Sequence, residues 1–538
     1  MRSLLHTRNL QAHPNPTEQS EKEAADSQRE DVELARRVAE LWPRQHLFTG
    51  LFWVACAACL VMLFQVSKLE DRPPEEELWD GIDDNTTSTT TSTTRTTTRR
   101  QVTSTYPPPL MTESEEVSVL CGGLESCRDR PFIGVNLGGW LVLDNHLLPT
   151  FMNGSADERS FIAKLDPSEA KATMDAHWSS FVTQDDISRL ANEGRVTHVR
   201  IPTGYWLFSE DAVDGYVTGG ERYLFRLLDW LKIYQMKAVL VLDELPGRGS
   251  ASGSFFDSKE AFDVAQRFIK RFAEFVLRSN RNKLTLDVIV GVEPLKEPPW
   301  RFWNDAYGLR TFYEAAVPIL RKALSREKVA ILLGFGGPTH RDEGVEWLER
   351  KREENVDVYT SVFYDTHIFH NYGDNDAPGR SWRLEVDSCK TCCRDPVLLK
   401  PLLAARVSVV VGEYSVQTGF RGGSWSGSLE YLRVQTSLWA ASSGIAGSFY
   451  WNFKRQRRAG EDAGSDPQSA SFLELLEASR NRSSSTPRLI TRRAAKPCPG
   501  KDLSDCPAFR AGEVLWTDDC EWKSKDIGGA VARPETIS

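Results

Sequence analysis

The sequence predicts an α/β fold in which eight parallel strands close into a (β/α)8 barrel. Short apolar runs of strand length recur eight times, and segments with helical spacing, such as Tyr223–Tyr234 and Ala261–Arg278, lie between them. Near-continuous apolar strands are typical of a parallel sheet covered on both faces, and eight strands close a barrel. The expected strands are Phe132–Leu137, Val196–Pro202, Lys237–Leu242, Leu286–Val292, Val329–Gly334, Val358–Tyr364, Val407–Gly412 and Ile445–Trp451.

A doubly wound open sheet is the alternative for the same alternation of strands and helices. Dinucleotide-binding sheets of that kind carry a G-x-G-x-x-G turn after the first strand. Here the first strand leads into GVNLGGW, which lacks that spacing. The barrel is the better prediction, and it occupies residues 117–480.

The segments before the barrel differ sharply from it in composition. Residues 1–46 are polar and charged and predict a disordered tail, whereas 47–66 hold twenty residues without a charge. A helix of that length crosses the hydrocarbon core of a bilayer, about 30 Å thick. The alternatives are a buried helix or a signal peptide. The run is too long, and begins too far from the N-terminus, for a signal peptide. Residues 67–116 are rich in Thr and Pro, as in an O-glycosylated stalk.

The flanking charges predict the orientation of this membrane helix. Four arginines lie within twenty residues before it, and one lysine and one arginine lie within twenty after it. The positive-inside rule then places the N-terminus in the cytoplasm and the barrel outside the cell or in the lumen. This gives a type II membrane protein of the plasma membrane or secretory pathway. The sequons at Asn85, Asn153 and Asn481 fall after the helix, and so do eight of the ten cysteines: Cys121, Cys127, Cys389, Cys392, Cys393, Cys498, Cys506 and Cys520.

Disulfides are expected among these eight cysteines, with a connectivity that the sequence leaves open. Residues 481–538 form a Cys-containing extension beyond the barrel. The net charge of −9 offers no basic stripe to neutralise phosphates, which excludes a nucleic-acid-binding protein. The oligomeric state is not predicted.

Two glutamates fall where a barrel of this kind places its active site. The residues past the C-terminal ends of the strands line that site. Glu297 ends the fourth expected strand and Glu413 the seventh, so they face each other across the mouth. Cleavage of a glycosidic bond needs such a pair, a proton donor and a nucleophile. Judged by position alone, the alternative is that both glutamates are exposed residues at the rim of the barrel without a role in catalysis. Arg200, His367 and Trp451 follow three other expected strands and strengthen the first interpretation.

Six blocks, FIGVNLGGWLVLD, THVRIPTGYWLF, GVEPLKEP, DTHIFH, VVVGEYS and GSFYWNFK, resemble glycoside hydrolase family 5 over residues 120–460. Within that family they are most similar to the exo-β-1,3-glucanase branch. The resemblance implies a barrel with retaining chemistry and neither metal nor organic cofactor. It implies Glu297 as general acid/base, Glu413 as nucleophile and Arg200 as the residue that orients the nucleophile. It also implies His367 beside the carboxylates, Trp451 as a platform under the sugar, and Phe256 as an aromatic near the leaving group.

The sequence departs from that family at several positions around the sugar. Lys296 replaces an Asn before the acid/base, Asp243 replaces a His after the third strand, and Phe369 replaces a Tyr. Asp144 stands for a Glu in the sugar site, Tyr414 for a Trp after the nucleophile, and Gln456 for a Glu after Lys454.

The two changes at Asp243 and Lys296 fall on neighbouring strands and have opposite charges. We therefore expect an ion pair that holds the lysine charge away from Glu297, since a cation beside an acid/base would lower its pKa. Two function classes follow. The first is a retaining glycosidase or transglycosylase that acts on β-1,3-glucan or another β-glucoside. The second is a catalytically impaired relative that binds carbohydrate or serves as a scaffold at the cell surface.

Overall fold

The computed structural model describes the barrel and part of the segments that flank it. The described residues are 111–127, 131–209, 213, 215–246, 258–281, 288–298, 303–335, 341–370, 391, 395–405, 407–418, 423–442, 444–456, 467, 470–480, 514–516 and 522–524. The predicted tail, membrane segment and most of the stalk lie outside them, as do Phe256 and six of the eight cysteines after the predicted membrane helix. No helix within the described ranges is long and apolar enough to cross a membrane.

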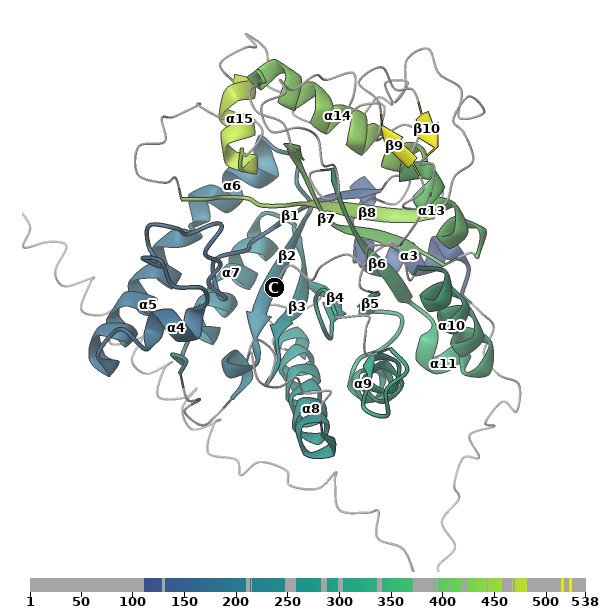
Figure 1. Ribbon diagram of the computed structural model, residues 1–538, viewed down its shortest axis with the longest axis horizontal. Helices are drawn as coiled ribbons and strands as arrows, with labels where there is room; N and C mark the ends of the chain where they lie inside the picture. The colour runs from purple at the N-terminus through teal and green to yellow at the C-terminus, as the bar shows by residue number, and fades with distance from the viewer. Residues whose placement is uncertain are drawn as a thin grey trace, which may run out of the picture. The chain divides into compact units, whose positions relative to one another are not determined.

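Eight strands form one closed barrel, and each pairs in parallel with its neighbours in chain order (Figure 1). The barrel closes where Gly134 of the first strand aligns with Phe449 of the last. Every strand carries a run of buried residues, as expected for a sheet with side chains packed inside and helices outside. The strands are β1 (Phe132–Asn136), β2 (His198–Gly204), β3 (Lys237–Glu244), β4 (Ile289–Glu293), β5 (Ala330–Gly334), β6 (Val362–His370), β7 (Val409–Thr418) and β8 (Ile445–Tyr450).

The predicted barrel is therefore confirmed, and the strand boundaries show where apolar content misled the prediction. The sixth strand begins at Val362, because Val358 and Tyr359 belong to a short helix, α11 (Val356–Tyr359). The side chain of Asn355 accepts a hydrogen bond from the Val358 amide and caps that helix. Strands β6 and β7 both run several residues past their predicted ends, which carries their polar tips into the mouth of the barrel.

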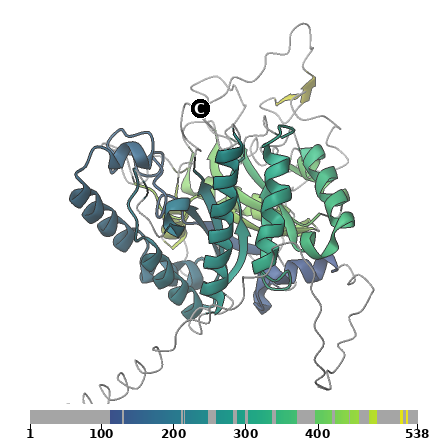
Figure 2. The ribbon, with the colours of Figure 1, turned by 90° about the horizontal axis from the view of Figure 1, so that it is seen from below.

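The helices cover the outside of the barrel (Figures 1 and 2). Helix α8 shows the reason: its buried positions recur every three or four residues, which is the spacing of one face of a helix. Some helices begin with a side-chain cap, as α6 does at Thr183. The helices around the barrel are α4 (Glu158–Ile162), α5 (Pro167–Phe181), α6 (Gln184–Asn192), α7 (Glu221–Ile233), α8 (Lys259–Arg281), α9 (Leu309–Ala323), α10 (Arg341–Glu354), α13 (Asp395–Ala404), α14 (Trp425–Ala441) and α15 (Phe472–Arg480).

One end of the barrel is closed by helix α3 (Glu113–Cys121), which begins before the expected start of the barrel domain. Val119 and Leu120 pack in one apolar cluster with side chains inside the barrel, such as Val239 and Leu332. Cys121 and Cys127 form a disulfide, with Cα atoms 5.8 Å apart, within this cluster. The interior is thus filled from the N-terminal ends of the strands, and polar groups gather at the other ends.

The described part of the C-terminal extension is one antiparallel pair, β9 (Val514–Trp516) with β10 (Trp522–Ser524).

Candidate active site

Arg200 is the centre of the polar cluster in the mouth of the barrel. It lies within β2, not after it as predicted, and its side chain is fully buried. Nε and Nη2 donate to Oε2 of Glu293, at 3.1 and 2.6 Å, and Nη1 donates to Oε1 of Glu413 at 2.8 Å. Nη2 also lies 3.4 Å from Oδ2 of Asp365. These carboxylates raise the pKa of Arg200, although burial opposes its charge. Arg200 is thus a fixed cation that links β2 to three other strands, β4, β6 and β7.

Glu413 lies within β7, and its side chain is 4% exposed. Its Oε1 accepts from Arg200 at 2.8 Å, and the ammonium of Lys296 lies 3.3 Å from the same oxygen. Asn136 supports this arrangement, because its amide donates to the Gly412 carbonyl at 2.9 Å and its Oδ1 accepts from Arg200 at 2.9 Å. Two cations on one oxygen hold the Glu413 side chain in one orientation, which suits a nucleophile.

Lys296 lies in the turn after β4, and its amide donates to the Leu242 carbonyl of β3 at 2.9 Å. Its Nζ is 3.6 Å from Oδ2 of Asp243, so the two oppositely charged residues do lie together. The expected ion pair is therefore present, and Nζ also lies 3.3 Å from Oε1 of Glu413. The carboxylates of Asp243, Glu413 and Glu297 raise the pKa of Lys296 above its usual range, against the effect of burial.

Glu297 follows β4 by four residues and does not end it, since the strand stops at Glu293. Its φ of 43° is in the left-handed region, which is costly for a residue with a Cβ. This backbone conformation belongs to a turn that projects the carboxylate into the open mouth, where the side chain is 54% exposed. Glu297 is therefore accessible to solvent while Glu413 is enclosed. That difference suits a proton carrier facing a fixed nucleophile.

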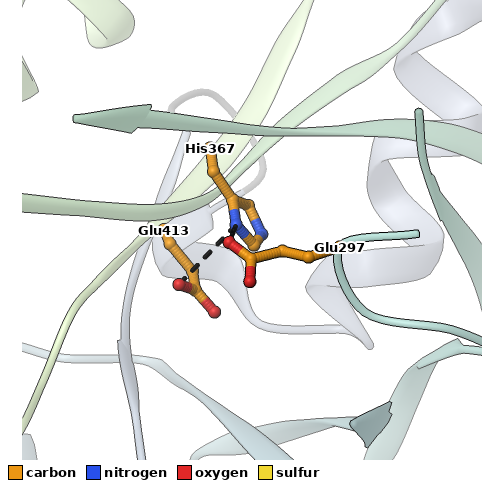
Figure 3. A group of neighbouring side chains, drawn as sticks. All are labelled: Glu297, His367 and Glu413. Carbon is orange, nitrogen blue, oxygen red and sulfur yellow. Dashed lines mark hydrogen bonds and ion pairs between the residues drawn. The ribbon is translucent and has the colours of Figure 1, made fainter. Parts of the chain in front are cut away.

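His367 joins the two glutamates (Figure 3). Its Nδ1 lies 2.9 Å from Oε1 of Glu297 and 3.6 Å from Oε2 of Glu413, and its Nε2 is 3.3 Å from Oδ2 of Asp365. His367 and Glu413 are direct neighbours across β6 and β7. Burial disfavours the charged ring, but the surrounding carboxylates, Glu413 first, raise the pKa of His367 well above its ordinary value. The raised pKa favours the protonated form of the ring beside Glu297.

Trp451 follows β8 directly and is partly buried at the mouth. A Cβ on Gly138 would lie 2.6 Å from the Trp451 ring, so the glycine allows the ring to lie against the loop after β1. Asn452 holds that loop, because its side chain exchanges two hydrogen bonds of 2.9 Å with the backbone of Gly138. The GVNLGGW block thus positions an aromatic surface next to the carboxylates. Lys296 Nζ lies 4.4 Å from the centre of this ring.

Other predicted site residues have different roles or positions. Asp144 does not reach the carboxylates through any contact shown: its Oδ1 accepts from the backbone amides of His146 and Leu147, at 2.8 and 3.4 Å, and forms a turn. Phe369 is partly buried in β6, two residues beyond His367. Phe256 lies outside the described residues.

The sequence analysis missed two buried acids, Glu293 and Asp365. Both interact with Arg200, and burial raises the pKa of Glu293 despite that partner. Among the described residues, Oε1 of Glu293 and Oδ1 of Asp365 are buried without a hydrogen-bond partner. A charged residue inside an otherwise apolar strand was the signal that could have found them. Gly412 makes room for Asp365, whose carboxylate a Cβ on the glycine would meet at 2.2 Å.

Glu297, His367 and Glu413 could in principle hold a metal ion, since one ligand atom of each lies within 4.8 Å of the others. The charges around Glu413 argue against it. Arg200 and Lys296 already occupy one oxygen of its carboxylate, and a divalent cation there would be repelled by both.

Known proteins resemble this chain in part, although no family model matches it. It is 32% identical over 295 residues to "Probable glucan 1,3-beta-glucosidase A" of Aspergillus fumigatus, which is 52% of this chain and 64% of that protein. It is 34% identical over 231 residues to the "Sporulation-specific glucan 1,3-beta-glucosidase" of Saccharomyces cerevisiae, which is 39% of this chain and 51% of that protein. The chain thus spans less than two thirds of the length of these relatives.

Among solved structures, a rutinosidase from Aspergillus niger superposes with a TM-score of 0.52 at 19% identity. The similarity covers 65% of this chain and 98% of that one. At this identity the similarity shows a shared fold, the eight-stranded barrel with its helices.

Proposed function

We propose that the chain is a retaining glycoside hydrolase that cleaves β-glucosidic bonds, exo-acting on β-1,3-glucan. One observation carries the proposal. An enclosed carboxylate, Glu413, and an accessible one, Glu297, face each other at the mouth of the barrel, with oxygens within 4.8 Å. Retaining glycosidases hold their two carboxyl groups about 5–5.5 Å apart, whereas inverting ones need about 6.5–9.5 Å to admit a water.

We assign the two roles from the exposure of the two carboxylates. Glu413 attacks the anomeric carbon, and the bond to the leaving oxygen breaks with its electron pair on that oxygen. Glu297 donates a proton to the same oxygen. In the second step Glu297 takes a proton from a water, which attacks the anomeric carbon and returns the electron pair to Glu413. His367 Nδ1 lies 2.9 Å from Oε1 of Glu297, so the ring is placed to return a proton to this carboxylate between turnovers.

Two further observations support a β-glucan as the substrate. The partly buried ring of Trp451 lies at the same mouth and offers an apolar face to a pyranose ring. The relatives at 32% and 34% identity bear the name glucan 1,3-beta-glucosidase. Transfer to a second sugar instead of water uses the same groups and remains within the proposal.

The test is glucose release from linear β-1,3-glucan by the full-length chain, with Glu413→Gly and Glu297→Ala beside it. Both variants should lose activity. Azide supplied with an activated aryl β-glucoside should then rescue each in a different way. Glu413→Gly should yield the α-glucosyl azide, because azide replaces the nucleophile, and Glu297→Ala should yield the β-glucosyl azide. Loss without this pattern of products would contradict the assigned roles.

The alternative is a carbohydrate-binding relative with little or no activity. Lys296 favours it, since its ammonium lies 4.4 Å from the Trp451 ring centre, near the surface where a sugar would stack. Glucan binding that persists in Glu413→Gly, with no glucose release by either protein, would establish this alternative.

We also propose that the chain is a type II membrane protein with the barrel outside the cytoplasm. The uncharged segment 47–66 supports it, and so does the exposed side chain of Asn153 in the sequon within the barrel. In sealed microsomes, protease should remove the N-terminal tail while the barrel stays protected and carries a glycan at Asn153. A protected tail with an unglycosylated Asn153 would refute the orientation.

A further inference from the structure

Lys296 contacts three other elements of the site at once. Its ammonium lies 3.6 Å from Asp243 at the end of β3, 3.3 Å from Glu413 in β7 and 4.4 Å from the ring centre of Trp451 after β8. The side chain is 8% exposed, so these contacts are formed away from bulk water. An ion pair shielded from water is stronger than one at the surface. A lysine with three such partners has a defined position.

The contacts distinguish the two oxygens of the Glu413 carboxylate. Arg200 and Lys296 both lie against Oε1, at 2.8 and 3.3 Å. His367 faces Oε2, at 3.6 Å, and the same ring bonds Glu297. Oε2 is therefore the oxygen on the side of the acid/base, and Oε1 is the one neutralised by two cations.

We propose that Lys296 is a positioning residue that acts through Glu413: it turns Oε2 toward the anomeric carbon and stabilises the carboxylate as it departs in the second step. This inference rests on the proposed function. It goes beyond that function by giving a role to a lysine that departs from the pattern of the resembling family.

The charge of Lys296 acts in opposite directions on the two steps. In the first step Glu413 gives up its negative charge as Oε2 bonds to the anomeric carbon, so a cation on Oε1 slows the attack. In the second step the bond between that carbon and Oε2 breaks, and its electron pair returns to the carboxylate. A cation on Oε1 then stabilises the departing group and speeds the reaction. Lys296 thus favours release of the glycosyl-enzyme over its formation.

The experiment compares the full-length chain with Lys296→Met, which removes the charge and keeps much of the length of the side chain. The substrate is 2,4-dinitrophenyl β-glucoside, whose leaving group departs easily, so the second step limits the rate. For Lys296→Met, kcat should fall about 10- to 100-fold, the effect expected for the loss of one charge-assisted hydrogen bond. KM should fall by more than kcat does, so that kcat/KM, which reports the first step, rises. The release of dinitrophenolate after the burst should be slower than in the wild type, and the glycosyl-enzyme should accumulate and be visible by intact-protein mass spectrometry.

Two matched variants separate charge from shape. Lys296→Arg keeps a cation and should restore kcat to within a few-fold of the wild type. Asp243→Asn removes the other anion and keeps the ammonium on Glu413, so its loss in kcat should be smaller than that of Lys296→Met and its kcat/KM should not rise. If the second variant behaved as Lys296→Met does, the ion pair with Asp243 would be the active feature and the inference would be wrong.

Other outcomes also decide the matter. Equal losses in kcat and kcat/KM without a burst would show that Lys296 only shapes the site, which overturns the inference and leaves the proposed function intact. If Glu413→Gly still hydrolysed the aryl glucoside, or if the wild type did not hydrolyse it, the proposed function would be wrong. The inference would then be wrong with it.

Discussion

Replacement of Arg200 by Met should destabilise the protein in a way that depends on pH. The guanidinium is fully buried and bonds Glu293, Glu413 and Asn136, with Asp365 at 3.4 Å. Without it, three buried carboxyl groups share a cavity that lacks their strongest counter-charge. Breaking a buried ion pair by removing one partner costs about 3–5 kcal/mol. We expect a loss of that size in the free energy of unfolding at pH 7.

The deficit should shrink as the pH falls. In the variant, the carboxyl groups around the cavity take up protons in the folded state at a higher pH than they do in the unfolded chain. The folded state then binds more protons than the unfolded state, so its stability rises as the pH decreases. Between pH 7 and pH 5 the deficit should fall by about 1–3 kcal/mol, since one proton corresponds to about 1.4 kcal/mol per pH unit.

Arg321 provides a matched control. It is a partly buried arginine whose guanidinium donates to backbone carbonyls, those of Val329, Val358, Thr360 and Ser361, at 2.7–3.1 Å. Burial lowers the pKa of Arg321 to about 9, so it stays charged between pH 5 and pH 7. Arg321→Met should therefore lose stability by a similar amount at both values.

The assay is urea unfolding followed by tryptophan fluorescence at pH 5 and pH 7, on wild type and both variants. The reasoning would be refuted if Arg200→Met lost the same free energy at both pH values, because the cost would then come from lost volume and not from charge. A loss below about 1 kcal/mol at pH 7 would refute it equally.

Three further predictions follow from the site and the barrel. Because the pKa of His367 is raised, its charge contributes stability below its unfolded pKa, and that contribution is lost as the pH rises through the folded pKa. The same ring contacts Glu297, so the proton it holds is shared with the acid/base. His367→Gln should move the alkaline limb of kcat/KM to lower pH, and an unchanged limb would exclude a shared proton. Gly138→Ala should displace the Trp451 ring, because the new Cβ would lie 2.6 Å from it, raising KM for glucan and costing about 1–3 kcal/mol in unfolding experiments; unchanged KM would count against the aromatic platform. Replacing Cys121 and Cys127 by Ala should cost about 2 kcal/mol, as expected for a short closed loop, and a reductant should lower the wild-type unfolding midpoint but leave that of the double variant unchanged.

Much of the candidate site was accessible to sequence reasoning. Glu297, Glu413, Arg200 and His367 stand at the ends of apolar runs, and parallel strands bring such ends to one rim, so their proximity followed from the pattern. The opposite charges of Asp243 and Lys296 on neighbouring strands likewise predicted their contact. These inferences succeeded because each depends only on strand order and on the common direction of the strands.

The sequence by itself determined the barrel, since eight apolar segments separated by amphipathic helices have few other ways to bury their surface. Only the tertiary structure decided how the charges pair. Glu293 and Asp365 were missed because a polar residue in a strand faces the interior or the exterior according to the register, and register shifts interrupt both β6–β7 and β7–β8. Lys296 reaches Glu413 through a long flexible side chain whose direction no local pattern encodes. Strand order follows from local sequence, whereas the distances between the charged groups depend on the packing of the whole barrel.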